Sequence, residues 1–223
     1  MNKIVNYLDE LIPNPVCELT YKKDYELLIK VMLSAQTTDK KVNTVADQLF
    51  LKYPTLNSLK AAKLDDLEEI IRPLGTFSRK ALNIKKIATI LINEYNGKVI
   101  NNREVLESLP GIGRKSANVV LSNLFNENCL AVDTHVTRVS RRLGLTESSD
   151  PLVIEQDLSK KFKDYDLARL HHQLVLFGRY HCKAKNPACE NCNLKKICKK
   201  DSHFWESFYF TSTFLEIVAS APL

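Results

Sequence analysis

The sequence has no run of 18 apolar residues, and no basic then apolar leader with a small-residue cleavage site. The first absence argues against a helix that spans a bilayer, so no membrane partner is expected. The second favours a cytoplasmic protein, in a compartment where thiols are kept reduced. Any cluster of cysteines is therefore interpreted with reduced thiols in mind.

Patterns typical of β-structure are also missing. There is no sustained alternation of apolar and polar residues, no hairpin signal and no repeat of solenoid length. Apolar residues instead recur at spacings of three and four, which is typical of amphipathic helices. We expect an all-α fold, with helices over Leu64–Ile71, Arg103–Leu109 and Leu167–Tyr180. Two more helices are expected behind Asp39 and Ser78 as N-caps.

The composition is that of an ordinary globular protein. The chain has 223 residues, of which 44% are hydrophobic and 26% charged, enough for one large or two small domains. The formal net charge is +6. A basic excess favours a polyanionic partner, but a solvated surface explains the same excess, so charge alone does not decide between them.

Four of the six cysteines lie close together near the C-terminus. They are spaced C-x6-C-x2-C-x5-C, at Cys182, Cys189, Cys192 and Cys198. In a reducing compartment such a group is more typical of a metal centre than of two disulfides. Four thiolates suit a tetrahedral zinc ion or a [4Fe–4S] cluster. One C-x2-C knuckle is present where zinc ribbons usually have two, so the spacing favours iron–sulfur without excluding zinc.

A turn between two expected helices has the composition of an anion-binding hairpin, Leu109-Pro110-Gly111-Ile112-Gly113-Arg114-Lys115. Pro110 ends the first helix, and the two glycines permit positive φ and leave no Cβ between backbone and ligand. The next helix begins at once, so its amide groups and positive dipole end face the turn and can hold a phosphate. An ordinary glycine turn between helices is the alternative.

Lys115 is expected in the first turn of that second helix, the unfavourable end for a cation. Partial burial there would favour the neutral amine. A neutral amine is a nucleophile that can form a Schiff base at a sugar C1′. The alternative is a solvated lysine that pairs with phosphate.

Asp133 follows an apolar run and precedes a helix that opens with Thr134, so we expect it to be an N-cap. A capping carboxylate stays ionised at neutral pH, where it can stabilise positive charge on a sugar and move protons. His135 and Arg138 follow it. They either face the same groove or simply lie on the helix surface.

In this order and spacing the motifs resemble the endonuclease III family of DNA glycosylases. The resemblance covers about residues 20–200 and rests on the cysteine spacing and on four segments, Leu33–Gln36, Leu109–Val120, Val132–His135 and Gly178–Tyr180. It implies a [4Fe–4S] cluster rather than zinc on the four cysteines. It also implies two helical domains with DNA in the cleft between them.

The resemblance sets the expected domain limits. A six-helix barrel domain with the hairpin is expected over 18–128, and a helical iron–sulfur domain over 1–17 and 129–200. An aromatic-rich tail over 201–223 has no expected structure or role. A monomer associated with the nucleoid is expected.

The activity implied by the resemblance is that of a bifunctional glycosylase and abasic-site lyase. The expected partner is double-stranded DNA containing oxidised pyrimidines, such as thymine glycol, or abasic sites. The damaged base is flipped out of the duplex, which costs least at a damaged pair. Lys115 then attacks C1′ and expels the base, and β-elimination cuts the strand 3′ to the lesion. Asp133 assists departure of the base and proton transfer.

The resemblance also implies roles in holding the DNA. Gln36 would fill the gap left by the flipped base, and three residues would line or support the base pocket, Ser34, Asp39 and His135. Family members commonly carry a bulky apolar wedge where this chain has Thr76, so the wedge would be weaker here or be formed by Phe77. The remaining expected DNA contacts come from the hairpin and the cysteine loop: Gly111, Gly113, Arg114, Lys183 and Lys185.

Two other functions share part of this pattern. Adenine glycosylases that act on mismatches resemble the hairpin and the cysteine spacing. They lack a lysine at the position of Lys115 and carry a glutamate in an early helix, where this chain reads Met32–Gln36. A non-catalytic DNA-binding module would use the same hairpin without imine chemistry.

Overall fold

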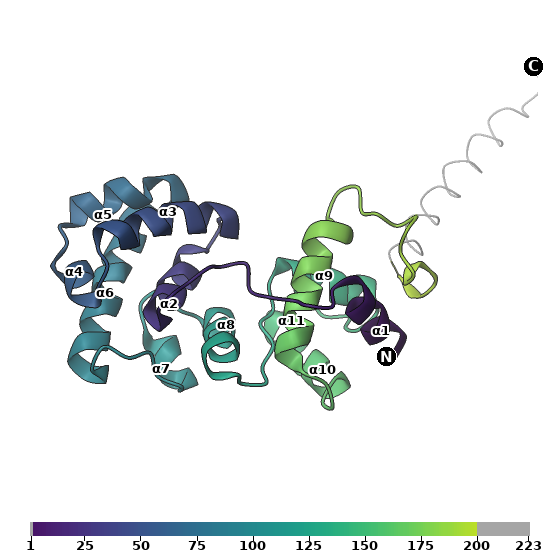
Figure 1. The fold of residues 1–223 in the computed structure, drawn as a ribbon. Coiled ribbons are helices and arrows are strands. Elements are labelled where there is room, and N and C mark those ends of the chain that lie inside the picture. Colours follow the sequence, from purple (N-terminus) through teal and green to yellow (C-terminus); the bar gives the residue numbers. More distant parts are fainter. Residues whose placement is uncertain (1, 200–223) are drawn as a thin grey trace, which may run out of the picture. The chain divides into compact units, whose positions relative to one another are not determined.

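The computed structural model describes residues 2–199, and every regular element in that range is helical (Figure 1). The α-helices are α1 Asn2–Leu11, α2 Asp24–Leu33, α3 Asp39–Lys52, α4 Leu56–Ala61, α5 Leu64–Ile71, α6 Phe77–Tyr95, α7 Arg103–Ser108, α8 Arg114–Phe125, α9 Thr134–Arg142, α10 Pro151–Lys161 and α11 Leu167–Leu176. Three short helices adjoin them, η1 Arg72–Leu74, η2 Phe177–His181 and η3 Lys195–Ile197. The all-α prediction is confirmed, and the tail over 201–223 lies outside the described residues.

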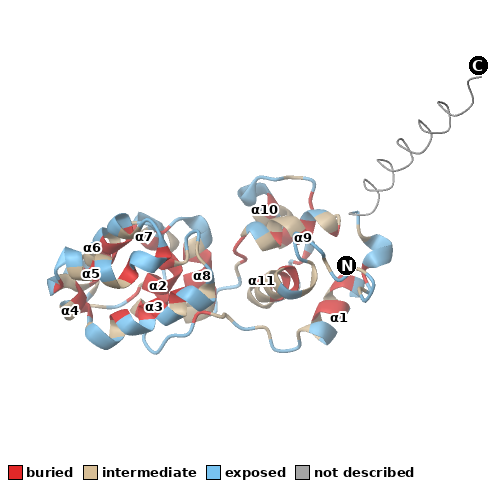
Figure 2. Ribbon diagram, turned by 90° about the horizontal axis from the view of Figure 1, so that it is seen from above, coloured by how far each residue is buried: buried red, intermediate tan, exposed pale blue. Residues whose placement is uncertain are grey.

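The chain divides into two compact units. The central unit is Val16–Ala131, and the terminal unit combines Met1–Pro15 with the chain from Val132 onward. In both units the buried residues lie on the inner sides of the helices (Figure 2). Across the described residues, no helix combines the length and apolar character needed to cross a bilayer.

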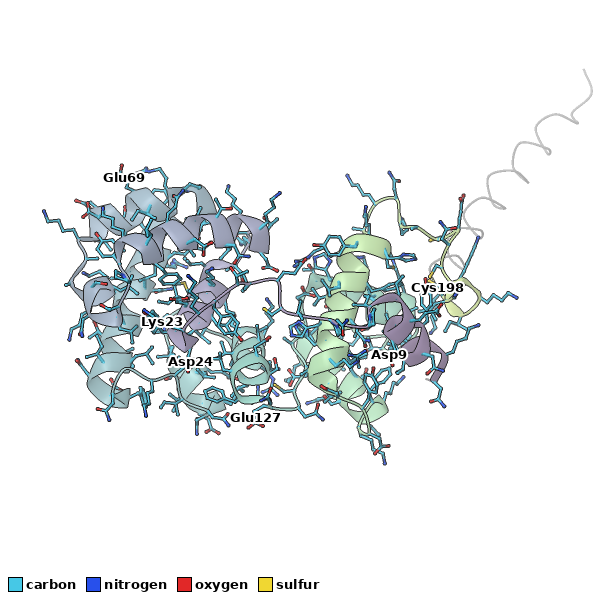
Figure 3. The ribbon with its side chains drawn as sticks, in the orientation of Figure 1. Asp9, Lys23, Asp24, Glu69, Glu127 and Cys198 are labelled. Carbon is cyan, nitrogen blue, oxygen red and sulfur yellow. The ribbon has the colours of Figure 1, made fainter. Side chains whose placement is uncertain are left out.

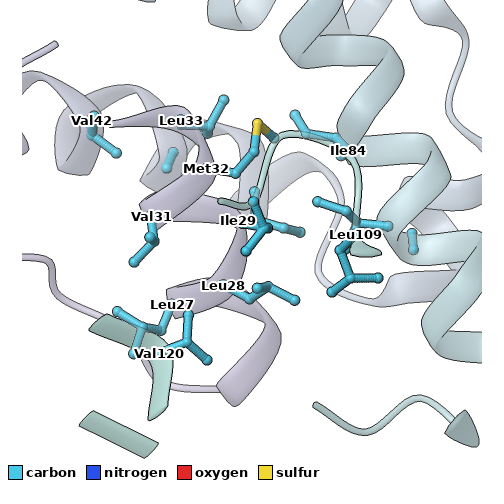
Figure 4. Packing of buried hydrophobic residues seen from close by; sticks show 14 of the residues in the cluster. Leu27, Leu28, Ile29, Val31, Met32, Leu33, Val42, Ile84, Leu109 and Val120 are labelled. Atoms are coloured by element: carbon cyan, nitrogen blue, oxygen red, sulfur yellow. The ribbon is translucent and has the colours of Figure 1, made fainter. Parts of the chain in front are cut away.

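The core of the central unit is built around α2. Every residue from Glu26 to Leu33 is buried, because this helix is apolar at nearly all positions. Helices α3, α6 and α8 contact it and contribute Val42, Ile84 and Val120 to the same cluster (Figure 4). Burying each such side chain contributes about 1.5–3 kcal/mol. The C-terminal end of α2 is therefore a rigid base for the loop that follows it.

The terminal unit joins the two ends of the chain. Helix α1 packs against α11, and α9 packs against α11 and η2. Its buried apolar side chains include Leu8, Val136, Val139, Leu170, Leu174 and Phe177. Asp9 of α1, labelled in Figure 3, accepts hydrogen bonds from Arg169 and Gln173 of α11, each with a contact of 2.8 Å. The N-terminal helix is thereby tied to the helix that precedes the cysteine loop.

Two predicted helix starts are wrong. Thr38, not Asp39, caps α3, because its side chain accepts a hydrogen bond from the amide of Lys41. Helix α6 begins at Phe77, and Ser78 lies in its first turn, because the left-handed residue Thr76 (φ 44°) ends the preceding loop. In both cases the N-cap is a neighbouring threonine, a residue type that is also common at this position.

The helix expected over Leu167–Tyr180 is divided. Helix α11 ends at Leu176 and continues as the π-helix η2, in which the amide of Cys182 donates to the carbonyl of Phe177 at 2.7 Å. A π turn inserts one extra residue and is frequent at functional sites. The π turn leads the chain directly into Cys182, the first cysteine of the C-terminal cluster.

Candidate DNA interface and metal centre

The predicted hairpin is present in the central unit. Helix α7 ends at Ser108 and α8 begins at Arg114. Between them the amide of Ile112 donates to the carbonyl of Leu109 at 3.1 Å, and the Ile112 side chain is buried in the core. The apolar side chain holds the turn from inside, so the exposed backbone of Gly111 and Gly113 faces outward. A helix start behind such a turn is suited to binding phosphate.

The two glycines of the hairpin differ in how strictly the structure requires them. Gly111 has φ 81°, and a Cβ there would come within 2.5 Å of Asn83 Nδ2 and 3.1 Å of Met32 Cγ. Gly113 has φ −108° and ψ −178°, and a Cβ there would meet nothing within 4 Å. The positive φ that glycine permits is therefore used only at Gly111, whereas Gly113 is extended and acts as the N-cap residue of α8.

Lys115 lies in the first turn of α8, as predicted, but its side chain is exposed. The prediction of partial burial is therefore wrong. The position remains unfavourable for a cation because the positive end of the helix dipole lies there. An exposed amine beside a turn suited to binding phosphate is accessible to a nucleic acid backbone and to its sugars.

Asp133 is the N-cap of α9, as predicted. Its Oδ1 accepts a hydrogen bond from the amide of Val136 at 2.8 Å. The half-buried carboxylate borders a surface cavity of about 710 Å³ in the terminal unit, together with the arginines Arg138, Arg141 and Arg142. The carboxylate therefore lies among three cationic side chains.

His135 and Arg138 do not both line that cavity. Arg138 lines it, whereas His135 is half-buried beside it, with Nδ1 at 3.2 Å from Arg138 Nη2. The Arg138 guanidinium also donates to the carbonyls of Gly178 at 2.7 Å and Cys182 at 3.2 Å. Burial and the neighbouring Arg142 lower the pKa of Arg138 from its ordinary value. Arg138 therefore joins α9 to η2.

Two loops of the central unit hold the residues expected to enter the duplex. Gln36 and Thr76 are both exposed, and both have left-handed backbones, with φ 59° and 44°. Such a conformation is uncommon for residues other than glycine and directs the backbone away from the preceding helix. Phe77 is only half-buried, packs against the core, and has the Arg72 guanidinium 4.7 Å from its ring centroid.

The residues expected around the base pocket have local structural roles. Ser34 is the C-cap of α2, and its hydroxyl donates to the carbonyl of Val31 at 2.8 Å. Asp39 is the first residue of α3. Both side chains are half-buried, so each retains exposed surface beside the loop that carries Gln36.

All four clustered cysteines line one small cavity, with Phe177, Leu143, His181 and Ala188 also on its wall. None of the six cysteines, all within the described residues, forms a disulfide, and these four are half-buried. Burial raises the pKa of Cys192. In the described part of the chain, no three Cys, His, Asp or Glu side chains are drawn together into a ligand set. Four cysteine side chains on the wall of one largely apolar cavity nevertheless fit a centre bound through sulfur.

The loop between Cys182 and Cys189 is held by Arg142 of α9. Its Nη1 lies 3.3 Å from Cys182 Sγ and donates to the carbonyl of Lys183 at 2.8 Å. Lys183 and Lys185 are both exposed. Their backbone is thus anchored to a helix while their side chains are available to phosphates.

Comparison with known proteins agrees with this arrangement. Residues 29–164 match the family model for the HhH-GPD superfamily of base excision DNA repair proteins. Endonuclease III of Bacillus subtilis (strain 168) is 42% identical over 194 residues, covering 86% of this chain and 89% of that protein. The chain belongs to the endonuclease III family. It is a base excision repair DNA glycosylase and abasic-site lyase, which confirms the predicted family and enzyme class.

Two solved structures extend the likeness to the fold. A non-covalent complex of an endonuclease III with DNA superposes with a TM-score of 0.88 at 42% identity, covering 92% of this chain and 96% of that chain. An endonuclease III trapped as a covalent intermediate with DNA has a TM-score of 0.85 at 44% identity, covering 92% and 98%.

Three residues of this region were missed by the sequence analysis or assigned only loosely: Lys80, Arg138 and Arg142. Each is a cation whose partners are backbone carbonyls distant in sequence, such as the Ala35 carbonyl 45 residues from Lys80. A carbonyl has no sequence signature. The available signal was weak: Lys80 falls on the inward face of α6, one residue before Ala81.

Proposed function

We propose that this enzyme removes oxidised pyrimidines from duplex DNA and then cuts the strand 3′ to the abasic site, acting as a monomer. The observation that carries the proposal is Lys115, an exposed amine in the opening turn of α8 directly behind a phosphate-binding hairpin. The likeness to an endonuclease III trapped covalently on DNA supports a nucleophile in this chain.

Lys115 is proposed to supply the attacking electron pair. Its Nζ forms a bond to C1′ as the bond from C1′ to the base breaks, and the base leaves with a proton. Ring opening gives an imine between Nζ and C1′. Loss of a proton from C2′ then breaks the bond from C3′ to oxygen, and the 3′ phosphate leaves. A duplex over the exposed lysine would exclude water from the amine and from C1′ during attack.

Asp133 is proposed to stabilise positive charge on the sugar as the base departs, and to transfer protons at C2′. Its N-cap hydrogen bond from Val136 keeps the carboxylate in one orientation without neutralising it. Positive charge on the sugar grows toward the transition state, so a fixed carboxylate contributes more there than in the bound substrate.

The DNA is proposed to contact both units. Gly111, Gly113 and Arg114 would bind the backbone at the hairpin, Gln36 would fill the vacated space, and Thr76 or Phe77 would act as the wedge. The pocket for the flipped base would be lined or supported by Ser34, Asp39 and His135, and Lys183 and Lys185 would pair with phosphates. The central unit would correspond to the barrel domain, and the terminal unit to the cluster domain.

Cys182, Cys189, Cys192 and Cys198 are proposed to hold a [4Fe–4S] cluster. Bound there, the cluster would tie the loop into a fixed shape and take no part in base removal. Arg142, which already contacts Cys182 Sγ, would place positive charge beside the ligand sulfur. Hydrogen bonds to ligand sulfurs are among the features that tune such clusters.

Borohydride trapping tests the central step. The parent enzyme incubated with a thymine glycol duplex and borohydride should give a covalent protein–DNA adduct, and Lys115→Ala should give none. Lys86→Ala, which removes an exposed lysine of α6 outside the site, is the matched control and should trap like the parent. A parent enzyme that binds the duplex but gives no adduct would support a non-catalytic DNA-binding module instead.

A further inference from the structure

Lys80 of α6 is buried between the two loops that are proposed to enter DNA. Its residue exposure is 4%, although lysine is rarely buried so completely. Its Nζ donates to the carbonyl of Ala35 at 3.0 Å and to the carbonyl of Leu74 at 3.0 Å. One ammonium group therefore links the loop after α2 to the loop before α6.

Each of these carbonyls belongs to a residue next to a strained segment. Ala35 precedes Gln36, whose φ is 59°, and Leu74 precedes Gly75 and Thr76, with φ of 68° and 44°. A left-handed backbone at Gln36 and Thr76 persists only where the surroundings hold it. Lys80 is part of those surroundings, since its own amide also donates to the Thr76 carbonyl at 3.1 Å.

A second contact ties the same two loops together. The hydroxyl of Thr37 donates to the Leu74 carbonyl at 2.9 Å, so this oxygen accepts from both Thr37 and Lys80. Both donors come from outside the Leu74 loop. The position of Gln36 is therefore coupled to the position of Thr76 through one shared acceptor.

The energetics of Lys80 differ from those of the other fully buried lysine. Lys30 pairs with the carboxylate of Asp47 at 2.7 Å. No acidic side chain within residues 2–199 pairs with Lys80, and burial lowers its pKa. Burying a charge without a counterion is costly, so the hydrogen bonds of Lys80 to two carbonyls have to offset that cost. Retaining a lysine at this point indicates a requirement for its two hydrogen bonds.

We infer that Lys80 is a positioning residue for base removal, which fixes the loops of Gln36 and Thr76 in one mutual arrangement so that both can enter the duplex together. The inference rests on the proposed role of Gln36 in filling the space left by the flipped base. Lys80 touches neither the lesion nor the sugar. It holds both loops in place before DNA binds, so that less conformational entropy is lost when the two residues enter the duplex.

The chain provides a matched control on the same helix. Lys85 also donates from Nζ to two backbone carbonyls, those of Lys60 and Ala62, which lie in and after α4 and not in the insertion loops. Lys85→Met therefore removes the same kind of contact from the same unit. A loss of activity caused only by a weakened helix α6 would appear in both Lys80→Met and Lys85→Met.

The test measures single-turnover base removal from a thymine glycol duplex with the fluorescent base 2-aminopurine opposite the lesion. Lys80→Met should slow base removal by about 10–100-fold and abolish the fluorescence change on insertion, because small misplacements near a reacting centre have effects of this size. Lys80→Arg should recover most of the rate, and Lys85→Met should stay within about 3-fold of the parent. If Lys80→Met does not fold, Thr37→Val takes its place as the test variant. Thr37→Val keeps the buried lysine but removes the hydrogen bond from Thr37 to the Leu74 carbonyl, so it should also slow insertion.

A double mutant identifies the route of the effect. Gln36→Ala alone should slow base removal, and adding Lys80→Met should slow it by less than about 2-fold more, since both changes remove one function. If the rate reductions of the two single mutants multiply in the double mutant, Lys80 acts independently of Gln36. That result would overturn this inference but leave the proposed role of Gln36 in place. An unchanged rate in Gln36→Ala would instead overturn the proposed role of Gln36, and the inference with it.

Discussion

Arg142 Nη1 lies 3.3 Å from Cys182 Sγ, and the same nitrogen donates to the carbonyl of Lys183, so one guanidinium connects a cysteine to the basic loop. Its Nη2 also donates to the carbonyl of Ala184 at 3.3 Å. The loop between Cys182 and Cys189 is thus attached to α9 by the contacts of the Arg142 side chain.

Replacing this arginine should release the loop. Hydrogen bonds from a charged donor contribute about 1.5–3 kcal/mol each, so Arg142→Met should make the amides of Cys182 and Ala188, which donate to the carbonyls of Phe177 and His181, exchange with solvent more rapidly. Hydrogen–deuterium exchange measures this directly. Arg141→Met removes an equal charge from the exposed neighbouring position and is the control. Equal acceleration in the two variants would show that charge, not the contacts of Arg142, protects the loop.

Asp133→Asn should separate the two roles of the capping residue. Asparagine caps helices about as well as aspartate, so the fold and the start of α9 should be preserved. The negative charge is lost, and turnover should fall by about 100-fold or more, while DNA affinity should stay within about 3-fold. Single-turnover rates and equilibrium binding on one lesion duplex measure both quantities. Parallel losses in rate and affinity would contradict a role in the transition state.

Gly111→Ala should disrupt the hairpin, whereas Gly113→Ala should not. Alanine at 111 would carry a left-handed φ of 81° and a Cβ only 2.5 Å from Asn83 Nδ2. Strain of this kind costs about 1–3 kcal/mol, which urea unfolding at equilibrium can measure. Gly113 is extended and open, so alanine there should leave stability within about 0.5 kcal/mol of the parent. Equal destabilisation would contradict the assigned geometry.

The local structure at the proposed catalytic residues could be predicted because its requirements lie within a few neighbouring positions of the sequence. A cap needs one side chain and the next helix, as at Asp133, and a hairpin needs a proline and glycines between two apolar stripes. The spacing of the cysteines is equally local. These features depend little on how distant parts of the chain pack.

Burial and long-range hydrogen bonding could not be predicted in the same way. The position of Lys115 on α8 follows from the sequence, but its exposure depends on which side chains surround it. Lys80 binds a carbonyl 45 residues away, and Arg138 binds one 40 residues away. Every residue has a carbonyl, so composition does not distinguish the acceptor that a buried cation will find.

At acidic pH, the free energy of unfolding should change with the protonation of Asp9. Burial alone would raise the pKa of Asp9, but hydrogen bonds from Arg169, Gln173 and Tyr165 outweigh it and lower the pKa below its ordinary value of 3.8. A lowered carboxyl pKa in the folded state means that the unfolded chain binds more protons in this range. The stabilisation is therefore complete above about pH 4–5 and declines as the pH falls toward the lowered pKa.

Asp9→Asn tests this sign. The variant keeps a hydrogen-bonding oxygen but loses the charge, so it should be less stable than the parent at about pH 7, and the difference should shrink at about pH 3. Free energies of unfolding in urea at the two pH values measure the change. Asp164→Asn, at an exposed acid of the same unit, should show no such trend. If the difference in free energy of unfolding between the parent and Asp9→Asn instead widens on acidification, the carboxylate is protonated more easily in the folded enzyme than in the unfolded chain. That result would contradict the stabilisation assigned to Asp9 between α1 and α11.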